Sequence, residues 1–295
     1  MKSTVLTLIR AVPRAALLLL GCLALLPAAH AGGDRLLGTW GVTQIEGGGG
    51  GGLSPWAIIT GNGSRNQIGG TASATYWRSG GGFSLRTVGA AVGIYDRVEL
   101  SATRWRFGLS DTVPGQSIDM DVIGAKWRLF GDAVYDQDTW TPQVSIGLQH
   151  KRNRDFTVPQ ALGARRRSDN DFYASATKVW LGGVAGRNVL ANLTLRATRA
   201  NQFGLLGFGG DKNDAYKLQP ETSIAMLVRD DLALGAEWRA RPDNLSVFRE
   251  QDATDLFVAW FPSRHLSTTI AFVDLGNIAN KPRQRGWYLS LQAAY

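Results

Sequence analysis

The amino-acid sequence predicts an all-β protein: a transmembrane, antiparallel, up-and-down β-barrel of about twelve strands in an outer membrane. Three observations lead to this prediction. They are an export signal at the N-terminus, repeated segments of roughly ten residues in which apolar and polar side chains alternate, and a last strand of this kind that ends on an aromatic residue. After residue 31 no continuous apolar run reaches the ~20 residues of a transmembrane helix, and helix-period apolar stripes are scarce.

Residues 1–31 are typical of a cleaved secretory signal. A positive beginning with Lys2, Arg10 and Arg14 precedes an apolar stretch over 15–26, and Ala29-His30-Ala31 has the small-x-small form of a cleavage site. About twelve apolar residues are too few for a retained membrane anchor. We therefore expect export from a Gram-negative cell and cleavage after Ala31.

The signal contains Cys22, the only cysteine of the chain. A lipidation site at 19–22 is the alternative interpretation, but the apolar run continues beyond the cysteine to Leu26. Without Cys22 the mature chain can form no disulfide, thiolate nucleophile or cysteine metal site. Cleavage also removes three of the 32 basic residues and none of the 24 acidic ones, so the net charge falls from +8 to +5. This modest excess does not point to nucleic acid.

The last strand is the clearest one. Trp287, Leu289, Leu291 and Tyr295 share one face with Ala293, while residues 288, 290, 292 and 294 share the other. A terminal aromatic residue that closes such a strand resembles the signal by which the barrel assembly machinery recognises outer-membrane proteins. We therefore expect these four residues to form the assembly signal.

Eleven further segments have period-two alternation or turn residues at their ends. The predicted strands cover residues 69–78, 83–94, 97–107, 118–130, 141–152, 170–182, 188–199, 214–229, 231–241, 253–262, 265–275 and 285–295. Short connections alternate with long ones, which places the C-terminus and the short turns on the periplasmic side. The polar faces predict lumen-lining residues, because a charge facing lipid costs several kcal/mol. These candidates are Glu99, Lys126, Arg128, Arg196, Glu237 and Arg239.

The segment 32–68 differs in composition from the barrel at 69–295, and it holds six consecutive glycines, Gly47 to Gly52. Polyglycine indicates a flexible tether. The segment either enters the lumen as a plug anchored by Trp40 and Trp56, or pairs residues 38–45 with 53–61 as an extra hairpin that makes fourteen strands. The plug is favoured, because 38–45 is short for a spanning strand.

The longer loops carry much of the basic excess, including Lys151, Arg152, Arg154 and the run Arg165, Arg166 and Arg167. Arginine forks match phosphate geometry, so this run is a candidate contact for lipopolysaccharide, against the simpler interpretation of a solvated loop.

Several stretches resemble an exported proteobacterial family, the domain of unknown function 3034. They are residues 88–101, 124–136, 203–211, 242–245 and 273–278. The resemblance extends over almost all of the mature chain. It implies an outer-membrane barrel and supplies no catalytic residue.

The residues themselves predict no enzyme, no cofactor and no metal. Two histidines remain after cleavage, and the only catalytic pairings to consider are His150 with a nearby serine and His265 with Asp274. Neither lies in a recognisable motif. The acidic run 211–214 lacks the spacing of a calcium loop, and the glycine-rich stretch 204–212 lacks the ending of a phosphate loop.

These observations favour a passive, porin-like channel for small polar solutes. The alternative is a closed structural barrel that acts through its outer loops, and a lipid-modifying or proteolytic barrel enzyme is a third class. The solute and the oligomeric state are left open.

Overall fold

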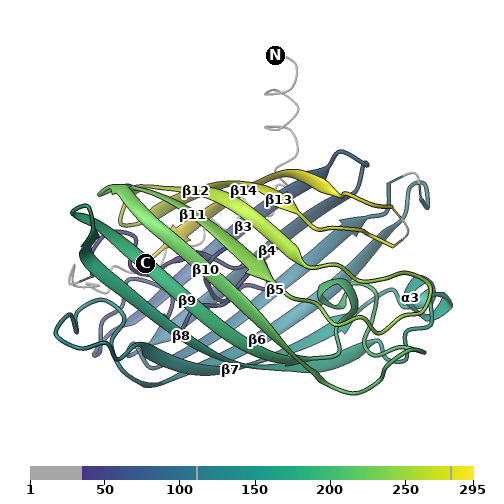
Figure 1. Cartoon of the computed structure of the whole chain (residues 1–295), viewed down its shortest axis with the longest axis horizontal. Helices are drawn as coiled ribbons and strands as arrows, with labels where there is room; N and C mark the ends of the chain where they lie inside the picture. The colour runs from purple at the N-terminus through teal and green to yellow at the C-terminus, as the bar shows by residue number, and fades with distance from the viewer. Residues whose placement is uncertain (1–34, 111, 280) are drawn as a thin grey trace, which may run out of the picture.

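The computed structural model describes residues 35–110, 112–279 and 281–295, so the predicted signal peptide lies outside the described residues. Twelve antiparallel strands form one closed barrel (Figure 1). These strands are β3 (Ile68–Ser79), β4 (Ser84–Ile94), β5 (Val98–Gly108), β6 (Ser117–Phe130), β7 (Gln143–Asn153), β8 (Ser168–Val184), β9 (Arg187–Thr198), β10 (Lys217–Arg229), β11 (Leu232–Arg239), β12 (Ala253–Ser263), β13 (Leu266–Asp274) and β14 (Arg285–Ala294). The predicted fold class is confirmed.

The barrel closes where its first strand meets its last. β14 pairs with β3 from Gly286 opposite Ser79 to Ala294 opposite Thr71. Each other strand pairs with its neighbours in sequence, so the barrel has no unpaired edge. Closure satisfies the backbone hydrogen bonds that a lipid environment leaves without water.

The two faces of the wall differ as the alternation predicts. On β6 the outward Ile123 and Trp127 are 62% and 56% exposed, whereas the inward Lys126 is 2% exposed. On β14 Trp287 is 66% exposed, while residues 286, 288, 290, 292 and 294 are buried. Apolar side chains therefore cover the outside, and many polar side chains are enclosed.

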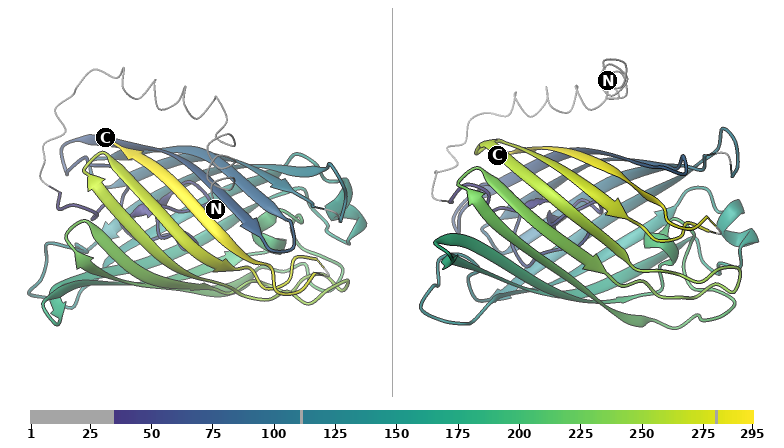
Figure 2. Two further views of the ribbon diagram at one scale, coloured as in Figure 1. Left: turned by 90° about the horizontal axis from the view of Figure 1, so that it is seen from above. Right: turned by 45° about the horizontal axis from the view of Figure 1, so that its top comes forward.

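Residues 40–63, which we call the plug, lie inside the barrel. Every residue of this segment is buried, and its trace occupies the half of the barrel near the C-terminus (Figures 1 and 2). Its two short strands, β1 (Val42–Thr43) and β2 (Gly49–Gly50), pair with each other and form a separate sheet. The fourteen-strand alternative is therefore wrong.

The two tryptophans of the plug pack against the wall. Trp40 meets the ring of Phe261 edge-on at 5.9 Å, and Trp56 Nε1 donates to Ser223 Oγ at 3.0 Å.

The glycine run is an ordered hairpin and not a flexible tether. Gly47 turns the chain with a φ of +97°, and its amide donates to Gln44 O. At Gly50 an added Cβ would lie 2.4 Å from the carbonyl oxygen of Ser54 and 2.9 Å from Pro55 Cα. The missing side chains allow a close approach of backbone to backbone, which propensity alone does not reveal.

The two ends of the barrel differ. The end that carries Tyr295, the C-terminal mouth, has short turns such as the three residues 95–97 between the paired Ile94 and Val98, where Tyr95 and Asp96 have positive φ angles. The opposite end, the loop mouth, carries the long connections with α3 (Thr157–Ala161) and the 3-10 turn η1 (Asn201–Gly204) (Figure 1). Among the described residues, no helix has the length and apolar character needed to cross a membrane.

Candidate functional site

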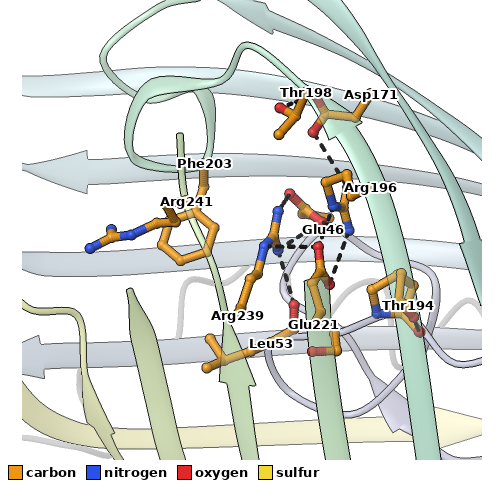
Figure 3. Close-up of polar contacts among 12 residues, drawn as sticks. Glu46, Leu53, Asp171, Thr194, Arg196, Thr198, Phe203, Glu221, Arg239 and Arg241 are labelled. Carbon is orange, nitrogen blue, oxygen red and sulfur yellow. Dashed lines mark hydrogen bonds and ion pairs between the residues drawn. The ribbon is translucent and has the colours of Figure 1, made fainter. Parts of the chain in front are cut away.

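The central feature of the lumen is the carboxylate of Glu46 at the tip of the plug hairpin, which three cations of the wall surround. Figure 3 shows two of them, Arg196 and Arg239. Arg239 of β11 binds it with both terminal nitrogens, at 3.0 Å to Oε1 and 3.1 Å to Oε2. Lys151 of β7 also contacts Oε1, and Arg196 of β9 lies 3.3 Å from Oε2. Glu46 and Lys151 are both completely buried.

Two acids of the wall complete this cluster. Asp171 of β8 lies 2.7 Å from Lys151 and 3.3 Å from Arg196. Glu221 of β10 contacts Arg196 and lies 3.3 Å from Nε of Arg239. The wall thus contributes three positive and two negative charges, and Glu46 makes the six-residue cluster neutral.

Neutrality matters because a buried charge without a partner is expensive. Burial alone raises the pKa of Glu46, but the positive charges of Arg196, Arg239 and Lys151 outweigh it and hold this pKa well below its ordinary range. Glu46 is therefore ionised at neutral pH. The wall residues of the cluster carry one excess positive charge, and the carboxylate of Glu46 in the plug neutralises it.

A second contact holds the plug through Glu99 and Lys126, on neighbouring strands β5 and β6. The Glu99 carboxylate accepts from the amides of Gly49 and Thr60 at 3.0 and 2.9 Å. Lys126 Nζ lies 3.1 Å from Glu99 and donates to the carbonyl oxygens of Gly49 and Ile58. This pair thus satisfies both donors and acceptors of the plug backbone.

The third contact involves Glu237 of β11. Its carboxylate accepts from the amide of Leu53 at 2.7 Å and from Ser223 Oγ at 2.6 Å. Asp255 of β12 lies opposite Glu237 in register and is also buried. Both acids are part of the wall around the plug.

A loop covers the cluster from the loop mouth. Residues 200–210 are all buried, and the ring of Phe203 lies 4.6 Å from the guanidinium of Arg239 and 5.2 Å from that of Arg241 (Figure 3). Its carbonyl oxygen accepts from Lys151 Nζ at 3.2 Å. Gln202 and Phe203 have φ angles of +46° and +65°, which cost non-glycine residues about 1–2 kcal/mol each.

The six residues predicted to line the lumen are all buried, and none of them is more than 7% exposed. Five contact the plug or its cluster as described above. The sixth, Arg128, lies at the C-terminal mouth, where it pairs with Asp96 and Asp132. Asp96 also binds Arg35, next to the plug. Burial raises the pKa of Asp96, although Arg35 and Arg128 act against this shift.

Four central residues were missing from the prediction: Glu46, Lys151, Asp171 and Glu221. Lys151 was assigned to the basic loops, which is wrong, because β7 continues to Asn153 and turns this side chain inward. The period-two spacing of Gln149 and Lys151 could have indicated it. Glu46 has a weaker signal, since it is the only acid between Arg35 and Arg65.

The basic run in the loop is already engaged within the protein. Arg165 donates to the carbonyl oxygen of Gly210, and Arg166 forms a two-bond pair with Asp214. Arg167 donates weakly to the carbonyl oxygen of Arg154 at 3.4 Å. These bonds use part of the donor capacity that a phosphate would need.

The predicted catalytic pairings are not assembled. His265 precedes β13 and bonds the carbonyl oxygen of Ala294, while Asp274 ends the same strand and binds Arg285. His150 Nδ1 lies 2.8 Å from Asn170 Oδ1 on the outer face. Among the described residues, no group of three or more histidine, cysteine or acidic side chains is placed to hold a metal ion.

Residues 39–292 match the family described as protein of unknown function (DUF3034), so the chain belongs to this family. None of the curated proteins matches this sequence. Solved barrels are similar in fold. The KdgM porin has a TM-score of 0.47 and 8% identity, over 76% of this chain and 99% of that one.

Two further barrels compare in the same way. Outer membrane protein Omp33 of Acinetobacter baumannii has a TM-score of 0.42 and 9% identity, over 78% of this chain and 97% of that one. Outer membrane phospholipase A of Escherichia coli has a TM-score of 0.43 and 11% identity, over 76% of this chain and 91% of that one. At these TM-scores and identities, the similarities support no functional inference.

Proposed function

We propose that this protein is exported to the outer membrane and forms a channel for small polar solutes, whose lumen the plug closes in the state seen here. One observation carries the proposal. The plug is fully enclosed by the barrel, yet it forms no ladder with any of the twelve strands. It can therefore leave without breaking the pairing that closes the barrel.

The chemistry of the wall supports a channel over a closed scaffold. Side chains alone fill a barrel of about eight strands, and a barrel of twelve strands encloses a wider lumen. Here the wall behind the plug presents ionised residues on β5, β6, β7, β9, β10 and β11, together with Thr177, Ser145 and Thr194. Such a surface suits water and polar solutes, and mixed charges across a pore select among them.

Two further features agree with an outer-membrane location. An exposed apolar surface surrounds the strands, and Trp287 and Leu291 of the last strand, β14, face outward. We place the C-terminal mouth in the periplasm, because short turns face that side in such barrels.

The test compares the mature chain with a chain that lacks residues 32–64, both refolded into detergent and inserted into a planar bilayer. We expect steady ion conductance from the truncated chain and little or none from the full one. Heat-modifiable gel migration of both chains is the control for folding. A folded but silent truncated chain would contradict the channel and favour the closed structural barrel.

A second proposed role is contact with lipopolysaccharide at the loop mouth. The candidates are outward side chains on or next to that end of β3 to β7, and two of them, Arg152 and Arg154, were among the basic loop residues named from the sequence. They are Arg78, Arg86, Arg104, Arg106, Arg152 and Arg154, and all six are exposed. Two acids, Asp119 and Asp121, are interleaved with them. This leaves a basic belt that matches the phosphates of the lipid.

A further inference from the structure

The cations around Glu46 have the geometry of a carboxylate-binding site. The two terminal nitrogens of Arg239 each face one oxygen of the carboxylate, at 3.0 and 3.1 Å, which is the fork-to-fork arrangement of arginine with a carboxylate. Lys151 and Arg196 contact the same group from two other strands. Gln44 Nε2 adds a fourth donor at 2.6 Å.

This site belongs mostly to the wall. Three of its donors lie on β7, β9 and β11, whose positions the barrel fixes, and these cations exceed the neighbouring wall acids by one charge. The plug contributes Gln44 and the bound group itself. When the plug is absent, an excess positive charge faces the open lumen, where it attracts anionic groups.

The covering loop also holds the guanidinium of Arg239 in the orientation that binds a carboxylate. Phe203 stacks near the guanidinium of Arg239 and leaves its terminal nitrogens directed at Glu46 (Figure 3). An aromatic face on one side of the guanidinium restricts its rotation and keeps its fork in place.

We propose that Lys151, Arg196 and Arg239 form a binding site for carboxylate-bearing solutes, which Glu46 occupies as a tethered ligand. The inference rests on the proposed channel for its solutes, because only an open lumen admits them. It assigns those solutes a chemical class: small molecules with a planar carboxylate. Such a solute competes with Glu46 for the same three cations.

The test is rescue of Glu46→Ala by formate, the smallest carboxylate. The full mature chain is unfolded and refolded in sodium formate or in sodium chloride of equal ionic strength, so that the probe enters during folding. We expect Glu46→Ala to unfold at a lower temperature than wild type in chloride, and formate to raise that temperature with a saturable concentration dependence. Wild type should behave alike in both salts.

Glu99→Ala is the matched control, because it removes another buried lumen carboxylate, which contacts one cation, Lys126, and two plug amides in place of three cations. We expect no saturable effect of formate on it. If Glu46→Ala does not refold in chloride, the yield of heat-modifiable protein in formate becomes the readout. Equal behaviour of Glu46→Ala in the two salts, by either readout, would overturn the site.

The rescue requires no current, so the two proposals can fail separately. A silent truncated chain with intact formate rescue would remove the channel and leave the carboxylate site. A conducting truncated chain without rescue would leave the channel and remove the site.

Discussion

At the scale of single residues, many buried charges in this barrel lie in ion pairs, and the loop mouth holds one pair whose protonation changes with pH. Arg241 and Glu250 lie 3.2 Å apart and are each 3% exposed at the side chain. Burial raises the pKa of Glu250 to about 7, even though Arg241 and the backbone amide of Gln202 favour its ionised form. Asp243 and Asp252 add to the upward shift.

Glu250 therefore predicts a pH dependence of stability. Because its pKa is raised on folding, its contribution is full below the ordinary value near 4.5 and is lost as pH rises through about 7. The change is about 3 kcal/mol. We expect Glu250→Gln to lose less stability than wild type between pH 5 and pH 8, measured by urea unfolding at both values. Parallel losses in the two proteins would contradict this role.

At the scale of elements, local pattern determines the strands well and the plug poorly. No predicted strand end differs from the observed one by more than three residues, because alternation and turn residues are local signals. The bonds of Glu46 join residues 105 and 193 positions apart. No local signal carries such pairings, so the charged cluster could be predicted only in part, from the polar faces of the strands.

The hairpin of the plug predicts a specific sensitivity at Gly50. Gly50→Ala places a Cβ against the backbone of Ser54 and Pro55, which cannot yield as a flexible side chain would. We expect a cost of about 1–3 kcal/mol, faster proteolysis within residues 40–63 and higher conductance of the full chain. Gly80→Ala is the control, since its nearest neighbour lies 3.9 Å away. Equal proteolysis of both variants would show that the backbone of Ser54 and Pro55 leaves room for a Cβ at position 50.

At the scale of the whole molecule, the outer surface is asymmetric. The exposed arginines of β3 to β7 gather near the loop mouth, and Arg86 lies directly opposite Arg106 between neighbouring strands. Like charges side by side repel each other, so an anion between them relieves a real cost. The sequence indicates only Arg152 and Arg154 of this belt, because alternation alone does not show that outward arginines of successive strands lie at the same end of the barrel.

The belt predicts salt-dependent binding of lipopolysaccharide. We expect the double variant Arg86→Gln, Arg106→Gln to bind lipopolysaccharide micelles several-fold more weakly at low salt and to lose part of the salt dependence. Arg187→Gln, exposed at the opposite mouth, is the control. The triple variant Arg165→Gln, Arg166→Gln, Arg167→Gln tests the loop run separately. Unchanged binding by the double variant would exclude the belt.

The end of the chain also constrains the order of folding. The carbonyl oxygen of Tyr295 accepts from Gly70 at 2.7 Å and from Asn62, at the exit of the plug, at 3.1 Å. Tyr295 thus bonds both to β3, where the barrel closes, and to the end of the plug. The closed lumen that holds the plug does not exist until β14 pairs with β3. The part of this barrel that is synthesised first therefore reaches its native surroundings last.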